Sequence, residues 1–98
     1  MTDAEFVRMF NTAGGWFIVS QYRLIAESNL PSRELLDRLF AQGFDSELSG
    51  TKTRLSAVKR IITEGRVRDA MEKIRDSANI NRVHPEAHDM AQEILDSL

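Results

Sequence analysis

Residues 50–68, GTKTRLSAVKRIITEGRVR, are the part of this sequence whose side chains are best suited to binding an anion. The segment carries six basic residues and a single acid, Glu64, whereas the whole chain has a net charge of −2. Ammonium and guanidinium groups bind phosphate and carboxylate oxygens, and neighbouring hydroxyl groups add hydrogen bonds to the same oxygens. The first functional hypothesis is therefore a local anion-binding surface on an acidic protein.

A helical wheel of residues 51–64 places the basic and hydroxyl side chains on one face, opposite an apolar stripe. Lys52, Ser56, Lys59 and Thr63 share a narrow sector, with Arg60 at its edge, and Leu55, Val58 and Ile61 lie opposite. The free N–H groups at the predicted start of this helix, at residues 50–53, would add a second anion site. The predicted binding residues of the segment are Lys52, Arg54, Ser56, Lys59, Arg60, Thr63, Arg66 and Arg68.

Residues 32–64 have a helix-turn-helix-like order of a helix, a glycine turn and a basic helix, as in some DNA-binding proteins. Residues 43–50 make a longer connection than that motif has, unless a short helix at residues 45–49 makes it a three-helix variant. No aromatic residue lies among the bases to stack on nucleobases. Three interpretations stay open: a surface for a partner protein's carboxylates, a surface for nucleic-acid phosphates, and a solvated or internally paired face.

Other residues that could carry chemistry do not form complete sites. His84 and His88 have the spacing that can share a metal on a helix, but Pro85 stands where the zinc-protease pattern has glutamate and a third ligand is not evident. SGTKT lacks the lysine directly after glycine that a phosphate-binding loop needs. The chain has no cysteine, and neither a nucleophile–histidine–acid set nor a carboxylate pair is marked. We therefore predict no enzyme activity, no cofactor and no metal site.

A helical framework must position the basic face. Glycine, proline, serine and asparagine at residues 14–15, 29–32, 43–50, 65 and 79–85 separate helix-length segments with helical apolar spacing. Helices are predicted over residues 3–11, 16–27, 32–42, 51–64 and 66–78 and from residue 85 onward, although WFIV at residues 16–19 could instead be a short strand. The expected fold is all-α, a compact single-domain bundle of five to six short helices over residues 1–98.

The aromatic residues cluster in the first half of the chain, which is typical of a core. Trp16 follows the Gly14-Gly15 break and shares a polar strip with Arg23, so these two residues are predicted to form an exposed aromatic anchor. The first residues resemble no signal peptide, no apolar run is long enough to span a membrane, and the cysteine-free chain fits a reducing cytoplasm.

The leading hypothesis is a non-enzymatic, cytoplasmic protein–protein interaction module: an accessory subunit, adaptor or inhibitor, with a homodimer as one form of it. Its partner would be another protein or itself, and neither a membrane nor a small-molecule substrate is expected. The alternative is a small nucleic-acid-binding protein whose residues 32–64 contact phosphates. A phage or mobile-element origin would fit a compact chain of this length.

Overall fold

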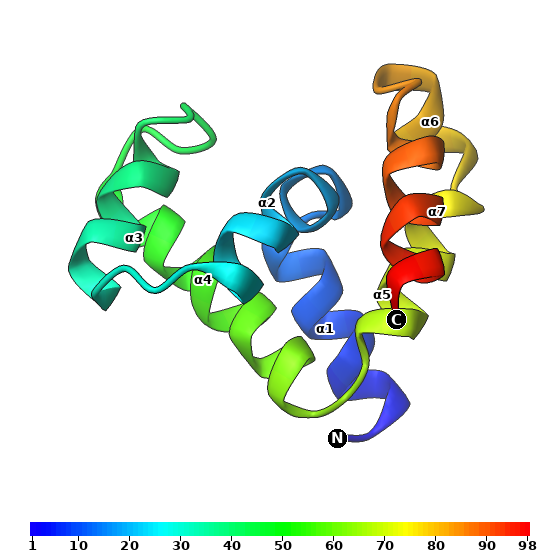
Figure 1. Cartoon of the computed structure of the whole chain (residues 1–98), viewed down its shortest axis with the longest axis horizontal. Coiled ribbons are helices and arrows are strands. Elements are labelled where there is room, and N and C mark those ends of the chain that lie inside the picture. Colours follow the sequence, from blue (N-terminus) through cyan, green and yellow to red (C-terminus); the bar gives the residue numbers. More distant parts are fainter.

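The chain folds into helices, which are separated by the break at Gly14-Gly15 and by connections such as residues 41–47 and 64–66 (Figure 1). The fold is described from a computed structural model that covers all 98 residues. Its helices are α1 (Asp3–Ala13), α2 (Gly15–Glu27), α3 (Ser32–Phe40), α4 (Leu48–Thr63), α5 (Val67–Arg75), α6 (Ala78–Val83) and α7 (Ala87–Ser97). The predicted all-α class is confirmed, whereas the predicted number of five to six helices is wrong, since there are seven.

The end of α1 and the start of α2 are set by two glycines. Gly14 has a φ of 84°, a left-handed conformation that L side chains rarely adopt, and it lets the chain turn between the helices. Gly15 lies where a Cβ atom would overlap the side chain of Ile80, because α2 begins close to α6. At its other end, α1 begins with a capping box in which Thr2 and Glu5 satisfy each other's backbone N–H groups.

The central helix is α2, which packs against α1, α4, α5 and α7. Phe17, Ile18 and Val19 are at most 2% exposed, so residues 17–19 lie in the core. The helical interpretation of residues 16–27 is confirmed, and the alternative of a short strand is wrong. A helix with apolar side chains around most of its circumference is stable here because neighbours cover most of that circumference.

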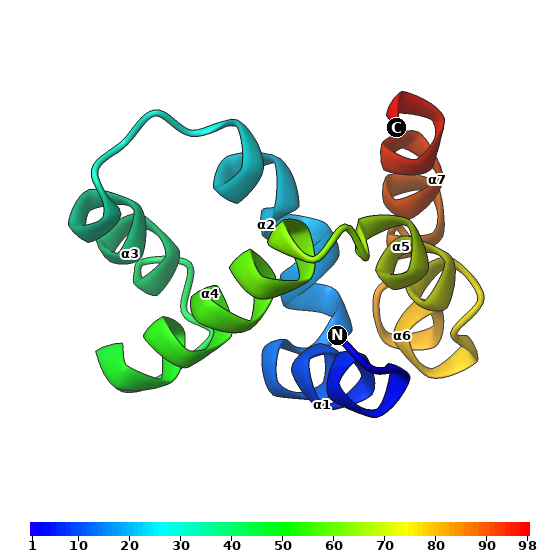
Figure 2. The same cartoon turned by 90° about the horizontal axis from the view of Figure 1, so that it is seen from below.

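Two groups of helices flank α1 and α2. α3 and α4 lie on one side, and α5, α6 and α7 on the other, in both views of the ribbon (Figures 1 and 2). α1 packs along α4, and α5 packs along α7. A single cluster of buried apolar residues runs through all helices except α6, and the molecule measures 32 × 28 × 25 Å. None of the helices has both the length and the apolar character needed to cross a membrane.

The additional helix is α6, which lies almost entirely within the break predicted at residues 79–85, and the helix before it ends at Arg75 rather than at the predicted residue 78. Ser77 adopts an extended conformation and accepts a hydrogen bond from the N–H of Ile80, so it caps a new helix, α6. Asn81 donates from Nδ2 to the carbonyl oxygens of Ile74 and Arg75, which satisfies the end of α5. The last helix begins at Ala87, because Pro85 and Glu86 form a turn.

Candidate interaction surface around α4

The outer face of α4 carries the basic and hydroxyl side chains that the helical wheel grouped. Lys52, Ser56, Lys59 and Thr63 are all exposed. On the opposite face Leu55, Val58 and Ile61 are buried at 6%, 1% and 1% exposure. The buried stripe fixes the rotation of α4, and the packing of α1 and α3 beside it leaves this polar row uncovered.

Lys52 and Ser56, the first half of the polar row, lie between two open hollows. The first, of about 420 Å³, lies between α1 and α4 and is lined by Met9, Thr12, Lys52, Thr53, Ser56, Ala57 and Arg60. The second, of about 260 Å³, lies between α3 and α4 and is lined by Ser32, Arg33, Leu36, Lys52, Leu55, Ser56 and Lys59. Lys52 and Ser56 line both hollows, so the two form one continuous area. We call the residues that line these two hollows the α4 surface.

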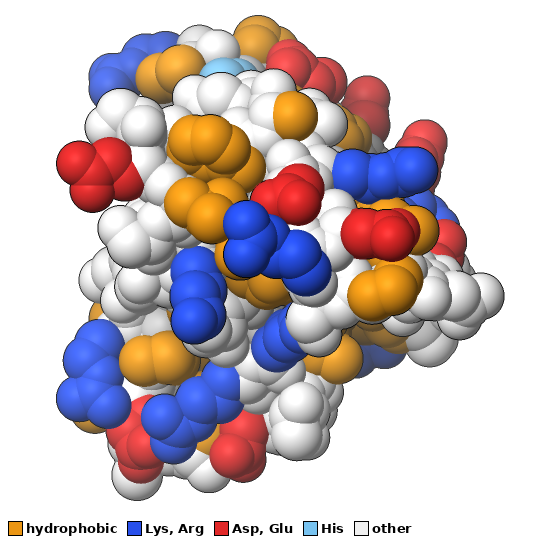
Figure 3. All heavy atoms as spheres, turned by 90° about the vertical axis from the view of Figure 1, so that its left-hand side faces the viewer, with side chains coloured by type: hydrophobic (Ala, Val, Ile, Leu, Met, Phe, Trp, Pro, Cys, Tyr) orange, Lys and Arg blue, Asp and Glu red, His pale blue; other side chains and the backbone are white.

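The α4 surface contains no acid. Its cations are Arg33, Lys52, Lys59 and Arg60, its hydroxyl groups come from Thr12, Ser32, Thr53 and Ser56, and its apolar atoms come from Met9, Leu36, Leu55 and Ala57. Figure 3, which views the side of the molecule that carries α3, shows Lys and Arg side chains gathered around apolar and uncharged atoms. Such a mixture can bind carboxylate or phosphate oxygens and also pack against aliphatic side chains.

Arg54, one of the predicted binding residues, faces the inside of the molecule. Its Nε donates to both carboxylate oxygens of Asp45, at 3.1 and 3.0 Å, and its Nη1 donates to the carbonyl oxygen of Ala13 at 2.6 Å. The guanidinium therefore ties the end of α1 to the connection before α4. Its hydrogen bonds are made within the chain, and it does not lie on the α4 surface.

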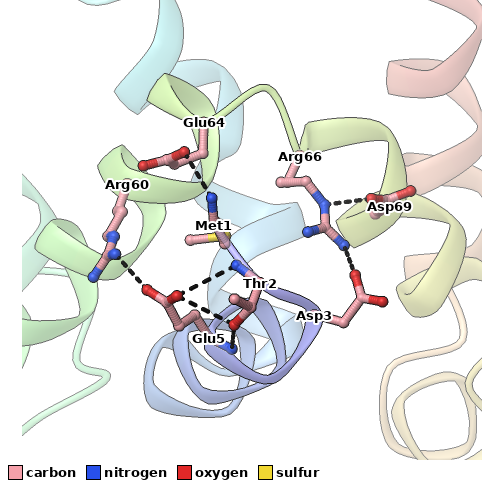
Figure 4. Close-up of polar contacts among 8 residues, drawn as sticks. All are labelled: Met1, Thr2, Asp3, Glu5, Arg60, Glu64, Arg66 and Asp69. Carbon is pink, nitrogen blue, oxygen red and sulfur yellow. Dashed lines mark hydrogen bonds and ion pairs between the residues drawn. The ribbon is translucent and has the colours of Figure 1, made fainter.

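Arg60 and Arg66 also have carboxylate partners, which come from α1 and the start of α5 (Figure 4). Arg60 pairs with Glu5 at 2.7 Å. Hydrogen bonds from the backbone and hydroxyl of Thr2, together with the charge of Arg60, hold the pKa of Glu5 below its ordinary value. Hydrogen bonds to Asp69 and then to Asp3 raise the pKa of Arg66, whose guanidinium also lies 4.5 Å from the ring centre of Phe6.

These pairings divide the predicted basic residues into two groups. Arg54, Arg60 and Arg66 are neutralised by acids of the same chain, as the interpretation of an internally paired face requires. Lys52, Lys59 and Arg68 take part in no ion pair, and all three are exposed, but Arg68 lies on α5, away from the α4 surface. The α4 surface thus keeps two lysines whose charges no carboxylate of the chain neutralises.

The predicted anion site at the start of the fourth helix is wrong. The helix begins at Leu48 rather than Thr51, and Thr51 is fully buried. Its hydroxyl donates to Asp45 at 3.0 Å, so an acid of the chain already lies where an external anion was expected. A Cβ atom on Gly50 would lie 3.0 Å from the Asp45 carboxyl group, which explains why glycine stands inside this helix. The separate short helix at residues 45–49 that would make residues 32–64 a three-helix variant is also absent, because residues 48 and 49 belong to α4.

Comparisons of the chain with protein-family models, with curated proteins and with solved structures give no match. Function is therefore inferred from the chemistry of the α4 surface.

Trp16 is not the exposed aromatic anchor that the sequence predicted. Its ring is half-buried and stacks on the imidazole of His84, with 4.0 Å between ring centres and 3° between ring planes. Arg23 is exposed and pairs with Glu27, one turn further along α2, at 3.6 Å. Whereas His84 stacks on Trp16, His88 lies beside Asp89. The two histidines therefore have different partners and do not face one ligand.

The two hollows were not predicted from the sequence. Met9 and Thr12 from α1, and Ser32, Arg33 and Leu36 from α3, line them only because these helices pack on either side of α4. Arg33 and Asp37 lie on an exposed face of α3 as an ordinary ion pair at 3.3 Å. No local pattern marks such residues, since their role depends on contacts between helices that are distant in the sequence.

Proposed function

We propose that this protein is a non-enzymatic protein–protein interaction module, an accessory subunit, adaptor or inhibitor, that binds an acidic segment of its partner on the α4 surface. One observation carries the proposal: Lys52 and Lys59 are exposed without a carboxylate partner on an area that contains no acid. Most arginines of the chain are paired with acids, among them Arg54, Arg60 and Arg66. The α4 surface is thus a place where a partner's carboxylates would meet uncompensated positive charge.

The shape of the surface favours an elongated partner segment. Lys52 and Lys59 lie along α4 beside the two hollows, so a helix or strand laid along α4 would fill one hollow and reach both lysines. The apolar atoms of Met9, Leu36 and Ala57 would pack against the aliphatic parts of its side chains. Electrostatic complementarity of this kind gives specificity and a fast association rate more than high affinity.

Nucleic acid is the second candidate, and the polar row of Lys52, Ser56, Lys59 and Thr63 is the observation in its favour. Three features favour a protein partner instead. α4 is flanked by α1 and α3, apolar side chains contribute to the lining of both hollows, and the chain carries a net charge of −2. Nucleic-acid affinity comes mostly from the number of phosphates that cations neutralise, and only Lys52 and Lys59 are unpaired cations on this surface.

The test is titration of the protein with a fluorescently labelled helical peptide rich in glutamate, followed by anisotropy at about 50 mM and about 500 mM salt. We expect binding that weakens as salt rises, and that falls at least about tenfold in the Lys52→Glu/Lys59→Glu variant. The matched control is Arg68→Glu/Arg82→Glu, which makes the same change in net charge away from the α4 surface and is expected to bind like the wild type.

Two results would contradict the proposal. One is an absence of peptide binding at low salt, and the other is an equal loss of binding in the control variant. Labelled duplex and single-stranded nucleic acid are titrated in parallel. Nucleic-acid binding that is tighter than peptide binding and is lost in Lys52→Glu/Lys59→Glu would establish the second candidate in place of the first.

A further inference from the structure

The outer face of α7 is a row of acids. Glu86, Asp89, Glu93 and Asp96 are spaced three, four and three residues apart, and all are exposed. This spacing places Asp89, Glu93 and Asp96 on one face of α7, and Glu86 is the residue immediately before the helix. α7 contains neither lysine nor arginine, and none of the four acids forms an ion pair with one. His84 and His88 are the only basic groups within ion-pair distance of the row, at 4.0 Å from Glu86 and 3.2 Å from Asp89.

This acidic row matches the polar row of α4 in length and spacing. From Glu86 to Asp96 the row spans about 15 Å, and from Lys52 to Thr63 the row of α4 spans about 16 Å, at 1.5 Å per residue. Met90 is half-buried beside the acidic row, so α7 also brings an apolar side chain to this side of the molecule. The chain therefore contains an acidic helix face of the kind that the α4 surface is proposed to bind.

The two rows cannot pair within one molecule. α3 and α4 lie toward one end of the longest axis, and α7 lies toward the other end (Figure 1). The helices that separate them, α1 and α2, form the middle of the core. A contact between an α4 surface and an α7 row therefore needs two molecules.

We infer that the α4 surface binds the acidic α7 face of a second copy of this chain, so that the protein self-associates head to tail. Lys52 and Lys59 of one copy lie along Glu93, Asp96 and the preceding acids of the next. Because each contact leaves one α4 surface and one α7 row free, the assembly grows beyond a dimer as concentration rises. The contact is held mainly by exposed charges, so salt weakens it. This inference rests on the proposed function and names the acidic segment.

The test is a charge-exchange experiment in which mass is measured by light scattering or sedimentation at about 50 mM salt and up to about 1 mM protein. The wild type is expected to increase in mass with concentration and to be monomeric at about 500 mM salt. Lys52→Glu/Lys59→Glu and Glu93→Lys/Asp96→Lys are each expected to stay monomeric. Glu93 and Asp96 are chosen because lysine is favourable in the second half of a helix. An equimolar mixture of the two variants is expected to associate again, because each then meets the opposite charge.

Several outcomes would overturn the inference: a monomeric wild type at low salt, association of either variant alone, or failure of the mixture to associate. Circular dichroism verifies that the variants are folded, and the single substitutions Lys59→Glu and Glu93→Lys serve if a double variant is not. Arg68→Glu/Arg82→Glu is the control that should still associate. The peptide titration keeps the two proposals apart, since a wild type that binds acidic peptide yet stays monomeric refutes self-association alone.

Discussion

Arg54 donates a hydrogen bond to the carbonyl oxygen of Ala13 across 2.6 Å, which joins the middle of α4 to the last residue of α1. The same guanidinium binds Asp45 through Nε, and Asp45 in turn accepts from the hydroxyl of the fully buried Thr51. Gly14 lies against this arrangement, since a Cβ atom there would be 3.1 Å from Nη1 of Arg54. A basic residue that looks like part of a binding face is therefore part of the framework.

Replacement of Arg54 by alanine is expected to destabilise the fold by about 2–3 kcal/mol, because it leaves Asp45 and the Ala13 carbonyl without their charged donor. Arg54→Lys should recover only part of this, since one ammonium cannot replace a guanidinium that binds two acceptors at once. Urea denaturation measures both changes. Arg68→Ala is the control, and we expect it to stay within about 0.5 kcal/mol of the wild type. Equal stabilities of Arg54→Ala and the control would show that Arg54 is not structural.

Acid should weaken the contact between α1 and α4 through Glu5. The hydrogen bonds from Thr2 and the charge of Arg60 place the pKa of the folded carboxyl group below its ordinary value of 4.5. Its contribution to stability is therefore complete above pH 4.5 and is lost as pH falls through the lower, folded pKa. Glu5→Gln keeps an oxygen that can accept from Thr2 but removes the charge. Denaturation between pH 7 and pH 3 measures the free energy of unfolding of the wild type and of Glu5→Gln. The wild type should be the more stable at pH 7, and the difference in free energy should shrink as pH falls. A difference that does not change with pH would contradict this role of Glu5.

The stack of Trp16 on His84 should be visible in fluorescence, because Trp16 is the only tryptophan. His84→Ala uncovers one face of the indole, so its emission maximum should move to longer wavelength and acrylamide should quench it more strongly. The stack should also contribute about 0.5–1.5 kcal/mol to stability. His88→Ala is the matched control, because His88 lies beside Asp89 rather than Trp16. If both variants change the emission equally, the stack is absent in solution.

The sequence was informative where apolar periodicity decides structure. Local spacing predicts a helix over residues 16–27 and a buried stripe of Leu55, Val58 and Ile61, and the structure confirms both. The prediction of where α4 begins was wrong at Gly50, because glycine is typical of a helix end. Gly50 lies inside α4, where a larger residue would place its Cβ atom against Asp45. Contacts of that kind join residues whose proximity has no local signature, and the same holds for the Trp16–His84 stack and the two hollows.

Substitutions of Ser56 can distinguish the stability of α4 from the binding that we propose for the α4 surface. It is an exposed residue in the interior of a helix, where serine is a weaker helix former than glutamate or glutamine. Ser56→Glu would lie one turn from Lys52, Lys59 and Arg60, so we expect a gain of about 0.5–1 kcal/mol from helix propensity and ion pairs. The same carboxylate would neutralise the centre of the α4 surface, so binding of an acidic peptide should fall at least about fivefold even though stability rises. Peptide titration and urea denaturation measure the two effects.

Ser56→Gln is the control for this last prediction, because glutamine has a comparable helix propensity and no charge. We expect it to be slightly more stable than the wild type and to retain peptide binding. Surface substitutions that stabilise a helix arise easily. A polar row that lacks carboxylates, although a carboxylate there would increase stability, is therefore what selection for binding would produce. If Ser56→Glu binds acidic peptide as tightly as Ser56→Gln does, the charge of the α4 surface does not determine what it binds, and its lysines are a solvated face.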